Sequence, residues 1–292
     1  MTNTVQLPAG PPQGKLAPSG GSAVREATSV GGTPAIEFIG VEKRFPPRGD
    51  TGEVLAAHDV SFAVAPGEVV SIIGPSGCGK STLLNMGSGL AKPSAGTVKV
   101  AGQVVQGPNE HVSFMLQKDL LMPWRTITEN IEFGLELRGV KSAERNAVSA
   151  RLLKQCRLTG FGGHYPHQLS GGMRQRAALA RTLAVDPLVL LMDEPFSALD
   201  AQTKMILQQD LAQTVAAEGK TVLLITHDLT EAVALSDRIL VMSERPGTIV
   251  EQIKVDLPDR NNPMVRRTRD EVGPYVARLM ALLKLDANTE VH

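Results

Sequence analysis

Hydrophobic positions from residue 35 onward form short runs that are typical of β-strands. The first run is AIEFIGVEKRF, which begins at residue 35, and the second is VLAAHDVSFAVAPGEVVSIIG. The Pro66-Gly67 pair interrupts the second run in the way that a turn closes a β meander. We therefore expect an antiparallel β layer over about residues 35–70, ahead of the more helical part of the chain.

Longer stretches with helical periodicity follow these strands. The segment KSTLLNMGSGL predicts a helix, and so does TITENIEFGLELRG, where Thr126 and Glu129 have capping-box spacing. Apolar residues in the second helix recur on one face, at Ile127, Ile131 and Leu135. These patterns indicate a helical lobe over about residues 118–185.

Three further apolar runs, LVLLMD, TVLLITH and RILVMS, alternate with helical patterns at residues 201–217 and 229–236. In the second of these helical patterns, Asp228 and Glu231 have the spacing of a capping box. Strand, helix, strand at these separations is typical of a parallel sheet with crossover helices. The predicted fold class is therefore α/β, with a mostly parallel sheet core, an antiparallel β layer and the helical lobe.

The first 33 residues differ from this pattern. They are dense in Gly, Pro, Ser and Thr and contain no aromatic residue or sustained apolar period. Such a composition cannot bury enough apolar surface to offset the conformational entropy lost on folding. We expect residues 1–33 to be a disordered tail.

Charge and cysteine content indicate which partners and which cellular compartment suit the protein. Among 292 residues, 30 Lys and Arg balance 30 Asp and Glu, so the balance gives no indication of a nucleic-acid partner. The two cysteines, Cys78 and Cys156, fit a reducing compartment, because a disulfide at Cys78 would obstruct the glycine-rich turn around it. No apolar run approaches the roughly 18 residues that span a bilayer, and the start lacks a signal-peptide pattern. These features predict a cytosolic chain that could still dock onto a membrane protein.

The glycine-rich turn is the segment GPSGCGKST, Gly74 to Thr82, which follows the apolar run EVVSIIG. Gly74, Gly79, Lys80 and Ser81 satisfy the G-x-x-x-x-G-K-[ST] pattern, with a predicted strand before it and a predicted helix after it. Glycines let backbone N–H groups approach a polyphosphate, and a helix N-terminus adds partial positive charge. Lys80 would neutralise the β and γ phosphates. The alternative is a glycine-rich turn with a chance lysine, which the two flanks disfavour.

Two carboxylates end a later apolar run. LVLLMDEP places Asp193 and Glu194 at the carboxyl end of a predicted buried strand, where open α/β sheets carry their ligand groups. Asp193 is suited to hold Mg²⁺ through water, and Glu194 to polarise an attacking water as a general base. The alternative is that the two acids only end the strand and cap the next turn.

A second candidate anion site lies between these two motifs, in LSGGMRQRAALARTLA, Leu169 to Ala184. Ser170 is placed as an N-cap, and Gly171 and Gly172 expose backbone N–H groups at the start of an amphipathic helix. One nucleotide does not need two such helix starts in one chain. This run resembles the signature sequence of the ATP-binding-cassette ATPases, which implies that it contacts the γ-phosphate of a nucleotide held by the other subunit of a homodimer.

The resemblance covers about residues 35–258, so we assign residues 34–258 to an ABC ATPase domain and residues 259–292 to a partly helical C-terminal extension. It implies a P-loop NTPase fold with ATP and Mg²⁺ as ligands. The implied catalytic residues are Glu194, His227 of LLITHD and Gln117 of FMLQKD. SALD, Ser197 to Asp200, matches the loop that communicates across the dimer. The implied nucleotide contacts are Phe45, Gly74, Pro75, Ser76, Gly77, Cys78 through its backbone, Gly79, Lys80, Ser81, Thr82, Ser170, Gly171 and Gly172, and the implied Mg²⁺ ligands are Ser81, Gln117 and Asp193.

Single residues of this set have structural alternatives. Phe45, which matches the aromatic that stacks on adenine, could instead be a core residue, because lone aromatics usually pack. His227 could be a structural histidine that ends a strand. Gln117 alone would more often be a solvated polar residue. Its place between the glycine-rich turn and the signature run is what favours a catalytic role.

Two other segments resemble one branch of the family, the importers of nitrate, sulfonates, taurine and related solutes. They are DLLMPWRTITENIEFGLELRGV and SERPGTIVEQIKVDLP, in which ERPG predicts a turn between two strands. The resemblance implies an ATPase subunit on the cytoplasmic face of the inner membrane, attached to permease subunits and supplied by an external solute-binding protein. We expect the permease to dock around residues 117–139, where Trp124 lies; the alternative is that Trp124 packs within the helical lobe.

Other functions remain open at this point. A soluble ABC-type ATPase of DNA repair or translation would usually carry long coiled-coil insertions or two cassettes, and this sequence has no sustained heptads. A P-loop kinase or GTPase would leave the signature run and His227 without a role. An exporter is disfavoured because no membrane segment is fused to the chain.

Overall fold

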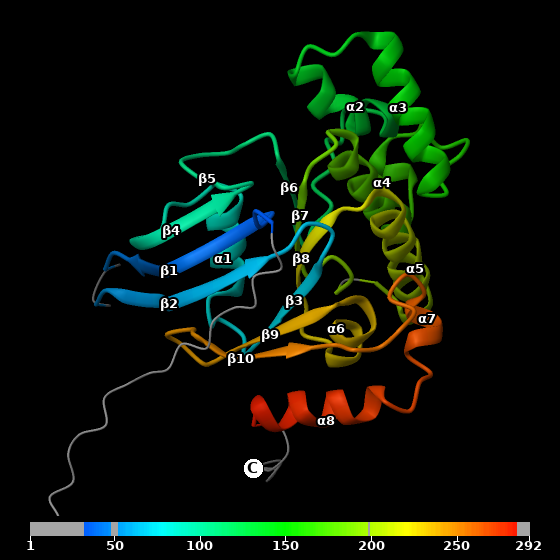
Figure 1. Cartoon of the computed structure of the whole chain (residues 1–292). Coiled ribbons are helices and arrows are strands. Elements are labelled where there is room, and N and C mark those ends of the chain that lie inside the picture. The colour runs from blue at the N-terminus through cyan, green and yellow to red at the C-terminus, as the bar shows by residue number, and fades with distance from the viewer. Residues whose placement is uncertain (1–31, 48–51, 198, 285–292) are drawn as a thin grey trace, which may run out of the picture.

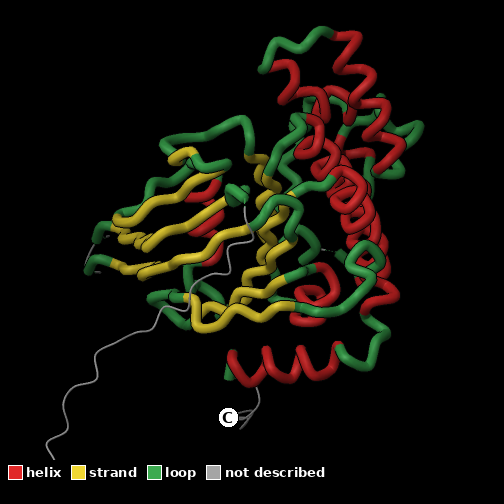
Figure 2. The backbone as a smooth tube through the Cα atoms, in the orientation of Figure 1, coloured by secondary structure: helices red, strands yellow, loops and turns green. Residues whose placement is uncertain are grey.

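The computed structural model describes residues 32–47, 52–197 and 199–284, and the predicted tail at residues 1–33 lies almost entirely outside them. The smaller sheet lies at the left of the molecule and the larger one in the middle, with helices on the right, at the top and at the bottom (Figure 1). Figure 2 shows the same division, with strands on one side and most helices on the other. The predicted α/β class is confirmed.

The smaller sheet is the antiparallel layer, with strand order β2-β1-β4-β5. Its strands are β1 (Ile36–Phe45), β2 (Val54–Val64), β4 (Ala95–Val100) and β5 (Gln103–Val104). The first two lie within the predicted 35–70 segment. The other two come after the glycine-rich turn and its helix, and no hydrophobic pattern had indicated them. This layer is therefore assembled from two separate parts of the chain.

The larger sheet has strand order β10-β9-β3-β8-β7-β6. Its strands are β3 (Val69–Ile73), β6 (Val112–Met115), β7 (Val189–Asp193), β8 (Thr221–Ile225), β9 (Arg238–Met242) and β10 (Ile249–Lys254). All neighbours are parallel except β10, which pairs antiparallel with β9 through the turn that ERPG predicted. The three apolar runs LVLLMD, TVLLITH and RILVMS form β7, β8 and β9, as expected.

The strands β3, β7, β8 and β9 of the larger sheet are buried on both faces, which explains why they are apolar at nearly every position. Along β7, Leu190 and Met192 pack with the helices α4 (Gly171–Ala184) and α5 (Ala201–Glu218), whereas Val189 and Leu191 point to the opposite core. That opposite core contains α1 (Lys80–Gly87), which contacts β4 of the antiparallel sheet and β7 of the larger sheet. The helix after the glycine-rich turn is thus held between the two sheets.

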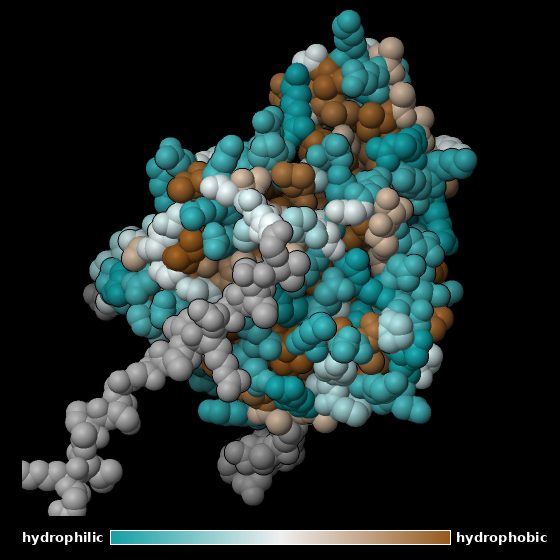
Figure 3. Space-filling view, viewed as in Figure 1, coloured by the Kyte–Doolittle hydropathy of each residue, from teal (hydrophilic) through white to brown (hydrophobic). Residues whose placement is uncertain are grey.

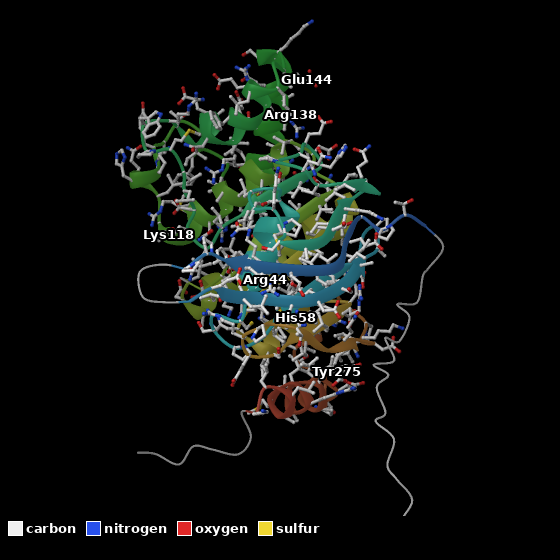
Figure 4. The ribbon with its side chains drawn as sticks, turned by 90° about the vertical axis from the view of Figure 1, so that its left-hand side faces the viewer. Arg44, His58, Lys118, Arg138, Glu144 and Tyr275 are labelled. Carbon is white, nitrogen blue, oxygen red and sulfur yellow. The ribbon has the colours of Figure 1, made fainter. Side chains whose placement is uncertain are left out.

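The helical lobe consists of α2 (Ile127–Leu137), α3 (Ser142–Gln155), a short 3₁₀ turn (Pro166–Gln168) and the start of α4. The predicted capping box is present: Thr126 Oγ1 accepts from the Glu129 N–H, and Glu129 accepts from the Thr126 N–H at 2.7 Å. The predicted apolar face of α2 is buried and packs in the same core as the end of α3. In the side view of Figure 4, Arg138 and Glu144 mark this lobe.

The last part of the chain contains α6 (Leu229–Leu235), α7 (Pro263–Arg266) and α8 (Val272–Leu282). Asp228 caps α6 by accepting from the Glu231 N–H at 2.9 Å, but the predicted return bond from Glu231 is wrong. The Glu231 carboxylate instead accepts from Gln208 at 2.7 Å and pairs with Lys204 at 2.9 Å, because it is buried against α5. Arg266 is buried at 1 % exposure and donates to carbonyls on either side, among them Ser236 and Leu257 at 2.9 and 3.0 Å, which holds α7 against the core.

None of the helices within the described residues combines the length and the apolar character that are needed to cross a membrane. Exposed hydrophobic side chains do occur on the helical lobe, where the space-filling view shows hydrophobic residues among hydrophilic ones at the upper end of the molecule (Figure 3).

Candidate nucleotide site

The glycine-rich turn joins β3 to α1 at the carboxyl end of β3, as its flanks predicted. Gly77 and Gly79 have φ values of +74° and +105°, in the left-handed region that favours glycine. A Cβ on Gly79 would lie 2.7 Å from the Ala56 carbonyl oxygen of β2. We call Gly74–Thr82 the phosphate loop. Its shape requires glycine both for the backbone conformation and for the close approach of the antiparallel sheet.

Lys80 begins α1 and its side chain folds back over the phosphate loop. Its Nζ donates to the carbonyls of Gly74 and Pro75, both at 2.8 Å, and the residue is only 8 % exposed. The Cys78 side chain is buried beneath the loop at 1 % exposure, with its Sγ 3.8 Å from Lys80 Nζ. The loop thus carries a cation at its centre, and Cys78 offers only its backbone to a ligand.

A cavity of about 730 Å³ opens beside this loop. It is bounded by the antiparallel sheet on one side and by the carboxyl ends of the parallel strands on the other. Phe45 lies in its wall with 40 % of its surface exposed, and Lys43 Nζ is 5.5 Å from the ring centroid. Phe45 therefore does not belong to the core. The lining residues are Phe45, Pro46, Val54, Ala56, Gly74, Ser76, Gly77, Gly79, Lys80, Ser81, Thr82, Glu194, His227 and Arg245.

The two predicted carboxylates lie at the end of β7, beside the phosphate loop. Burial raises the pKa of Asp193 above its ordinary value, and a hydrogen bond from Ser81 and the charge of Lys80 oppose that rise. The Ser81 hydroxyl and the Asp193 carboxylate are therefore neighbours, although they come from different parts of the sequence. Both supply oxygen atoms, which are the ligands that Mg²⁺ prefers, so this pair fits the predicted metal ion.

Glu194 and His227 meet across the ends of β7 and β8. Asp193 pairs with Ile225 in the parallel register, so the residues that follow each strand emerge at the same edge of the sheet. Glu194 Oε2 lies 3.2 Å from His227 Nδ1, and the Glu194 N–H donates to the Ile225 carbonyl at 3.0 Å. Glu194 has a φ of +47°, an uncommon conformation for a residue with a side chain. The backbone hydrogen bond holds this conformation and points the carboxylate at the imidazole.

Gln117 follows β6 and lies outside the residues that line the cavity. Its Nε2 donates to Ser197 Oγ at 3.0 Å, and Ser197 Oγ donates to the Glu194 carbonyl at 3.0 Å. Its own carbonyl accepts from Gln175 Nε2 on α4 at 3.1 Å. Gln117 thus connects the segment after Glu194 with the helical lobe.

The predicted second anion site is at the N-terminus of α4. Ser170 is the N-cap and accepts from the Met173 N–H at 3.3 Å, as predicted. Ser170 and Gly171 are exposed, whereas Gly172 is buried against α5, where an added Cβ would lie 2.3 Å from Thr203 Cγ2. None of these three residues lines the cavity. The N-terminus of α4 and the cavity are therefore separate parts of this chain.

Sequence reasoning missed four lining residues of the cavity: Pro46, Val54, Ala56 and Arg245. The first three come from β2 and the end of β1, which the fold brings over the phosphate loop. Arg245 belongs to the ERPG turn, which had been interpreted only as a turn. In the sequence, Arg245 is an arginine in a turn between two predicted strands. No neighbouring residue distinguishes it from an ordinary surface arginine.

The fold and the cavity together define the class of this protein: a P-loop NTPase, in which a mostly parallel sheet carries the phosphate loop and two carboxylates at the ends of its strands. The comparisons with known proteins specify the family. Residues 57–197 match the family model described as ABC transporter. The chain is 46% identical over 231 residues to an uncharacterized ABC transporter ATP-binding protein of Methanocaldococcus jannaschii, covering 79% of this chain and 85% of the relative. The chain belongs to the ABC transporter family.

Two further similarities add detail. The taurine import ATP-binding protein TauB of Yersinia pestis is 45% identical over 205 residues, which cover 70% of this chain and 80% of that protein. Among solved structures, the dimeric ATP-binding cassette MJ0796 bound to ADP and Pi matches with a TM-score of 0.67 and 33% identity, over 75% of this chain and 98% of that one. A second dimeric structure of MJ0796 matches equally well. The chain is therefore similar to ATP-binding subunits of ABC transporters, whose family hydrolyses ATP.

The contact of Gly79 with β2 gives a first prediction. Gly79→Ala places a Cβ against the Ala56 carbonyl and strains the phosphate loop, so we expect the affinity for ATP to fall by at least about tenfold, as titration with a fluorescent ATP analogue would measure. Gly160→Ala is the matched control. Gly160 also has a positive φ, +87°, but no described atom lies within 4 Å of an added Cβ, and it lies outside the cavity wall. Equal losses in both variants would contradict the role assigned to the Gly79 contact.

Proposed function

We propose that this protein is the ATP-hydrolysing subunit of an importer, and that ATP binds in the cavity beside the phosphate loop. The observation that carries the proposal is the convergence of Phe45, Lys80, Glu194 and His227 on one cavity, although they come from four different parts of the chain. An aromatic wall, a buried cation and a carboxylate–imidazole pair correspond to the base, the phosphates and the reacting water of a nucleoside triphosphate.

In this proposal each part of the cavity binds one part of ATP. The adenine stacks on the Phe45 ring, which is exposed to the cavity. Backbone N–H groups of the phosphate loop and the start of α1 receive the phosphates, and Lys80 moves its ammonium from the loop carbonyls to the β and γ phosphates. Ser81 and Asp193 hold Mg²⁺. When bound, Mg²⁺ would neutralise charge on the phosphate oxygens.

Hydrolysis follows from the Glu194–His227 pair. Glu194 accepts a proton from a water molecule, whose oxygen attacks the γ-phosphorus while the bond to the ADP oxygen breaks. His227 lies within hydrogen-bond distance of Glu194 and orients the carboxylate and the γ-phosphate. The products are ADP and phosphate. The Gln117 side chain donates to Ser197 near Glu194. In this proposal Gln117 contacts the metal ion and the γ-phosphate when ATP is bound, and so links the helical lobe to the nucleotide.

The predicted second anion site supports a homodimer. Ser170, Gly171 and Gly172 lie at the start of α4 on the helical lobe and do not line the cavity of their own chain, so in this proposal they contact a nucleotide held by another subunit. In a head-to-tail pair with two-fold symmetry, each phosphate loop faces the partner's α4 N-terminus. The dimeric structures of the similar cassette MJ0796 support this arrangement. ATP would then join the subunits, and its hydrolysis would let them separate.

An importer also needs a membrane partner. The segment 117–139 carries three highly exposed hydrophobic side chains, at Leu120 (55%), Trp124 (73%) and Leu137 (73%). Large apolar groups on a surface suit a groove that receives a partner's helix, so this segment is the proposed permease-docking surface. The similarity to a taurine import protein supports a small sulfonate-like or nitrate-like solute, delivered by an external solute-binding protein. The subunit would lie on the cytoplasmic face of the membrane.

The roles of Lys80 and Glu194 can be separated by mutation. Glu194→Gln keeps the shape of the side chain but removes the base, so ATP should still bind while turnover falls by on the order of a hundredfold or more. Lys80→Ala should weaken ATP binding itself, because it removes the cation within the phosphate loop. Binding titrations and steady-state ATPase assays distinguish the two. Near-normal hydrolysis by Glu194→Gln would assign the base to another residue.

The composite site can be tested by mixing two inactive proteins, Lys80→Ala and Ser170→Arg. In a mixed pair, one site collects both defects and the other collects neither, so some ATPase activity should return. Each variant alone is the control. A mixture without activity, although mixed pairs form, would mean that the composite site is wrong or that both sites must act together. Single-turnover hydrolysis by a linked heterodimer separates these two outcomes.

The docking surface predicts a selective effect of Trp124→Ala. This variant should recover about tenfold less of the membrane protein that co-purifies with the wild-type chain, whereas ATP binding and thermal stability of the lone subunit should be unchanged. Leu188→Ala is the matched control, because Leu188 is also exposed, at 48%, but lies outside residues 117–139. Intact assembly together with lower stability of the lone subunit would instead assign Trp124 to packing within the helical lobe.

A further inference from the structure

The turn between β9 and β10 lies directly against the phosphate loop, 168 residues away in sequence at Arg245 and Gly77. Arg245 Nε and Nη2 donate to the Gly77 carbonyl at 3.0 and 2.8 Å. Two residues later, a Cβ on Gly247 would lie 2.0 Å from the Cys78 carbonyl oxygen, so the backbones of the two loops are in contact. The Gly247 N–H also donates to the Ala56 carbonyl at 3.0 Å. The ERPG turn therefore packs against the Gly77–Cys78 part of the phosphate loop.

We propose that Arg245 is a positioning residue for the nucleotide, which fixes the Gly77–Cys78 peptide of the phosphate loop in the orientation that receives phosphate. The proposal rests on the proposed function, because it concerns ATP binding at the same loop. It assigns a role to a residue that the sequence placed only in the ERPG turn, without a function of its own.

The geometry of a single peptide unit explains how Arg245 acts. A trans peptide is planar, with its carbonyl and its N–H pointing in opposite directions. When the guanidinium holds the Gly77 carbonyl, the N–H of Cys78 must point away from the guanidinium. This N–H donates to the Pro75 carbonyl at 3.4 Å, which is long for such a bond and leaves the N–H available to a phosphate oxygen.

The composition of the loop explains why such support is needed. Gly77 is exposed, has a φ of +74° and carries no side chain that could restrict its backbone. Glycine loses more conformational freedom on ordering than any other residue. Two N–H groups of the planar Arg245 guanidinium donate to the Gly77 carbonyl and order this peptide before ATP binds. The loop therefore loses less conformational entropy when ATP binds.

Direct attraction of the phosphates by the Arg245 charge is an alternative to the positioning role, and the two roles predict different results. Arg245 lines the cavity, so its charge could attract the phosphates directly. A direct charge effect would be retained by lysine and weakened by salt, because salt screens exposed charges. The positioning role depends instead on two N–H groups of the planar guanidinium that donate to one carbonyl. Lysine presents a single point charge on a flexible stem and cannot reproduce that fork.

The test measures the affinity of the full-length protein for a fluorescent ATP analogue with Mg²⁺. Arg245→Ala should raise the Kd by about tenfold, and Arg245→Lys should recover only part of that loss. The loss should persist at about 0.5 M KCl, where the Debye length is only a few ångströms. Thermal unfolding without nucleotide should be unchanged, because the Arg245 side chain contacts an exposed part of the loop. At saturating ATP, turnover should also be close to that of the wild type, because the peptide acts on binding.

Arg260→Ala is the matched control. Arg260 Nη1 also donates to a glycine carbonyl, that of Gly67 at 3.3 Å, but Gly67 precedes β3, at the opposite end of the strand from the phosphate loop. This variant should bind the analogue within about twofold of the wild type. An equal loss in Arg260→Ala would assign the effect to general destabilisation and overturn the proposal.

Two other results would also overturn it. They are an Arg245→Ala Kd equal to that of the wild type, and full recovery by Arg245→Lys with loss of the effect in salt, which would indicate direct charge attraction. Failure of the wild-type protein itself to bind the analogue would instead contradict the proposed function. The two failures are therefore distinguishable.

Discussion

The close approach of the phosphate loop to the antiparallel sheet is the constraint on which the rest of this structure depends. Gly79 lies so near the Ala56 carbonyl of β2 that a single added carbon would clash at 2.7 Å. The phosphate loop is thus in close contact with β2, and α1 lies between the two sheets, in contact with β4 and β7. Because the loop is held there, the cavity has one wall from the antiparallel sheet and another from the ends of the parallel strands. Phe45 and Glu194 can then face the same ligand.

Parallel strand register supplies the second part of the site. Strands that run side by side in the same direction end at the same edge of a sheet, which is why α/β proteins bind ligands there. The pairing of Asp193 with Ile225 brings Glu194 and His227 to 3.2 Å from each other, although they are 33 residues apart. Ser197, close to Glu194 in the chain, accepts a hydrogen bond from the Gln117 side chain. The Gln117 carbonyl in turn accepts one from Gln175 on α4. Through these hydrogen bonds the helical lobe is in contact with the segment that carries the proposed base.

The phosphate loop is supported on several sides. Lys80 donates to the carbonyls of Gly74 and Pro75, the backbone of β2 contacts Gly79, and Arg245 donates to the Gly77 carbonyl. A loop rich in glycine gains its close approach to phosphate at the cost of flexibility, and contacts from elsewhere in the fold reduce that flexibility. The α4 N-terminus with its Ser170 N-cap belongs to the helical lobe and does not line this cavity. In the proposed homodimer, the second subunit's α4 N-terminus would complete the site.

The sequence by itself determined what depends on neighbouring residues. The glycine pattern of Gly74–Thr82, the capping box at Thr126, the Ser170 N-cap and the apolar strand before Asp193 are local signals, and each is present as predicted. The tertiary structure alone decided what depends on distant contacts. Strands β4 and β5 join the antiparallel sheet from beyond α1, Glu231 turns from its own helix start to Lys204, and Arg245 reaches a carbonyl 168 residues away. The physical reason is that a capping bond or a turn conformation is defined by adjacent residues, whereas a long-range contact exists only after the sheets have formed and packed.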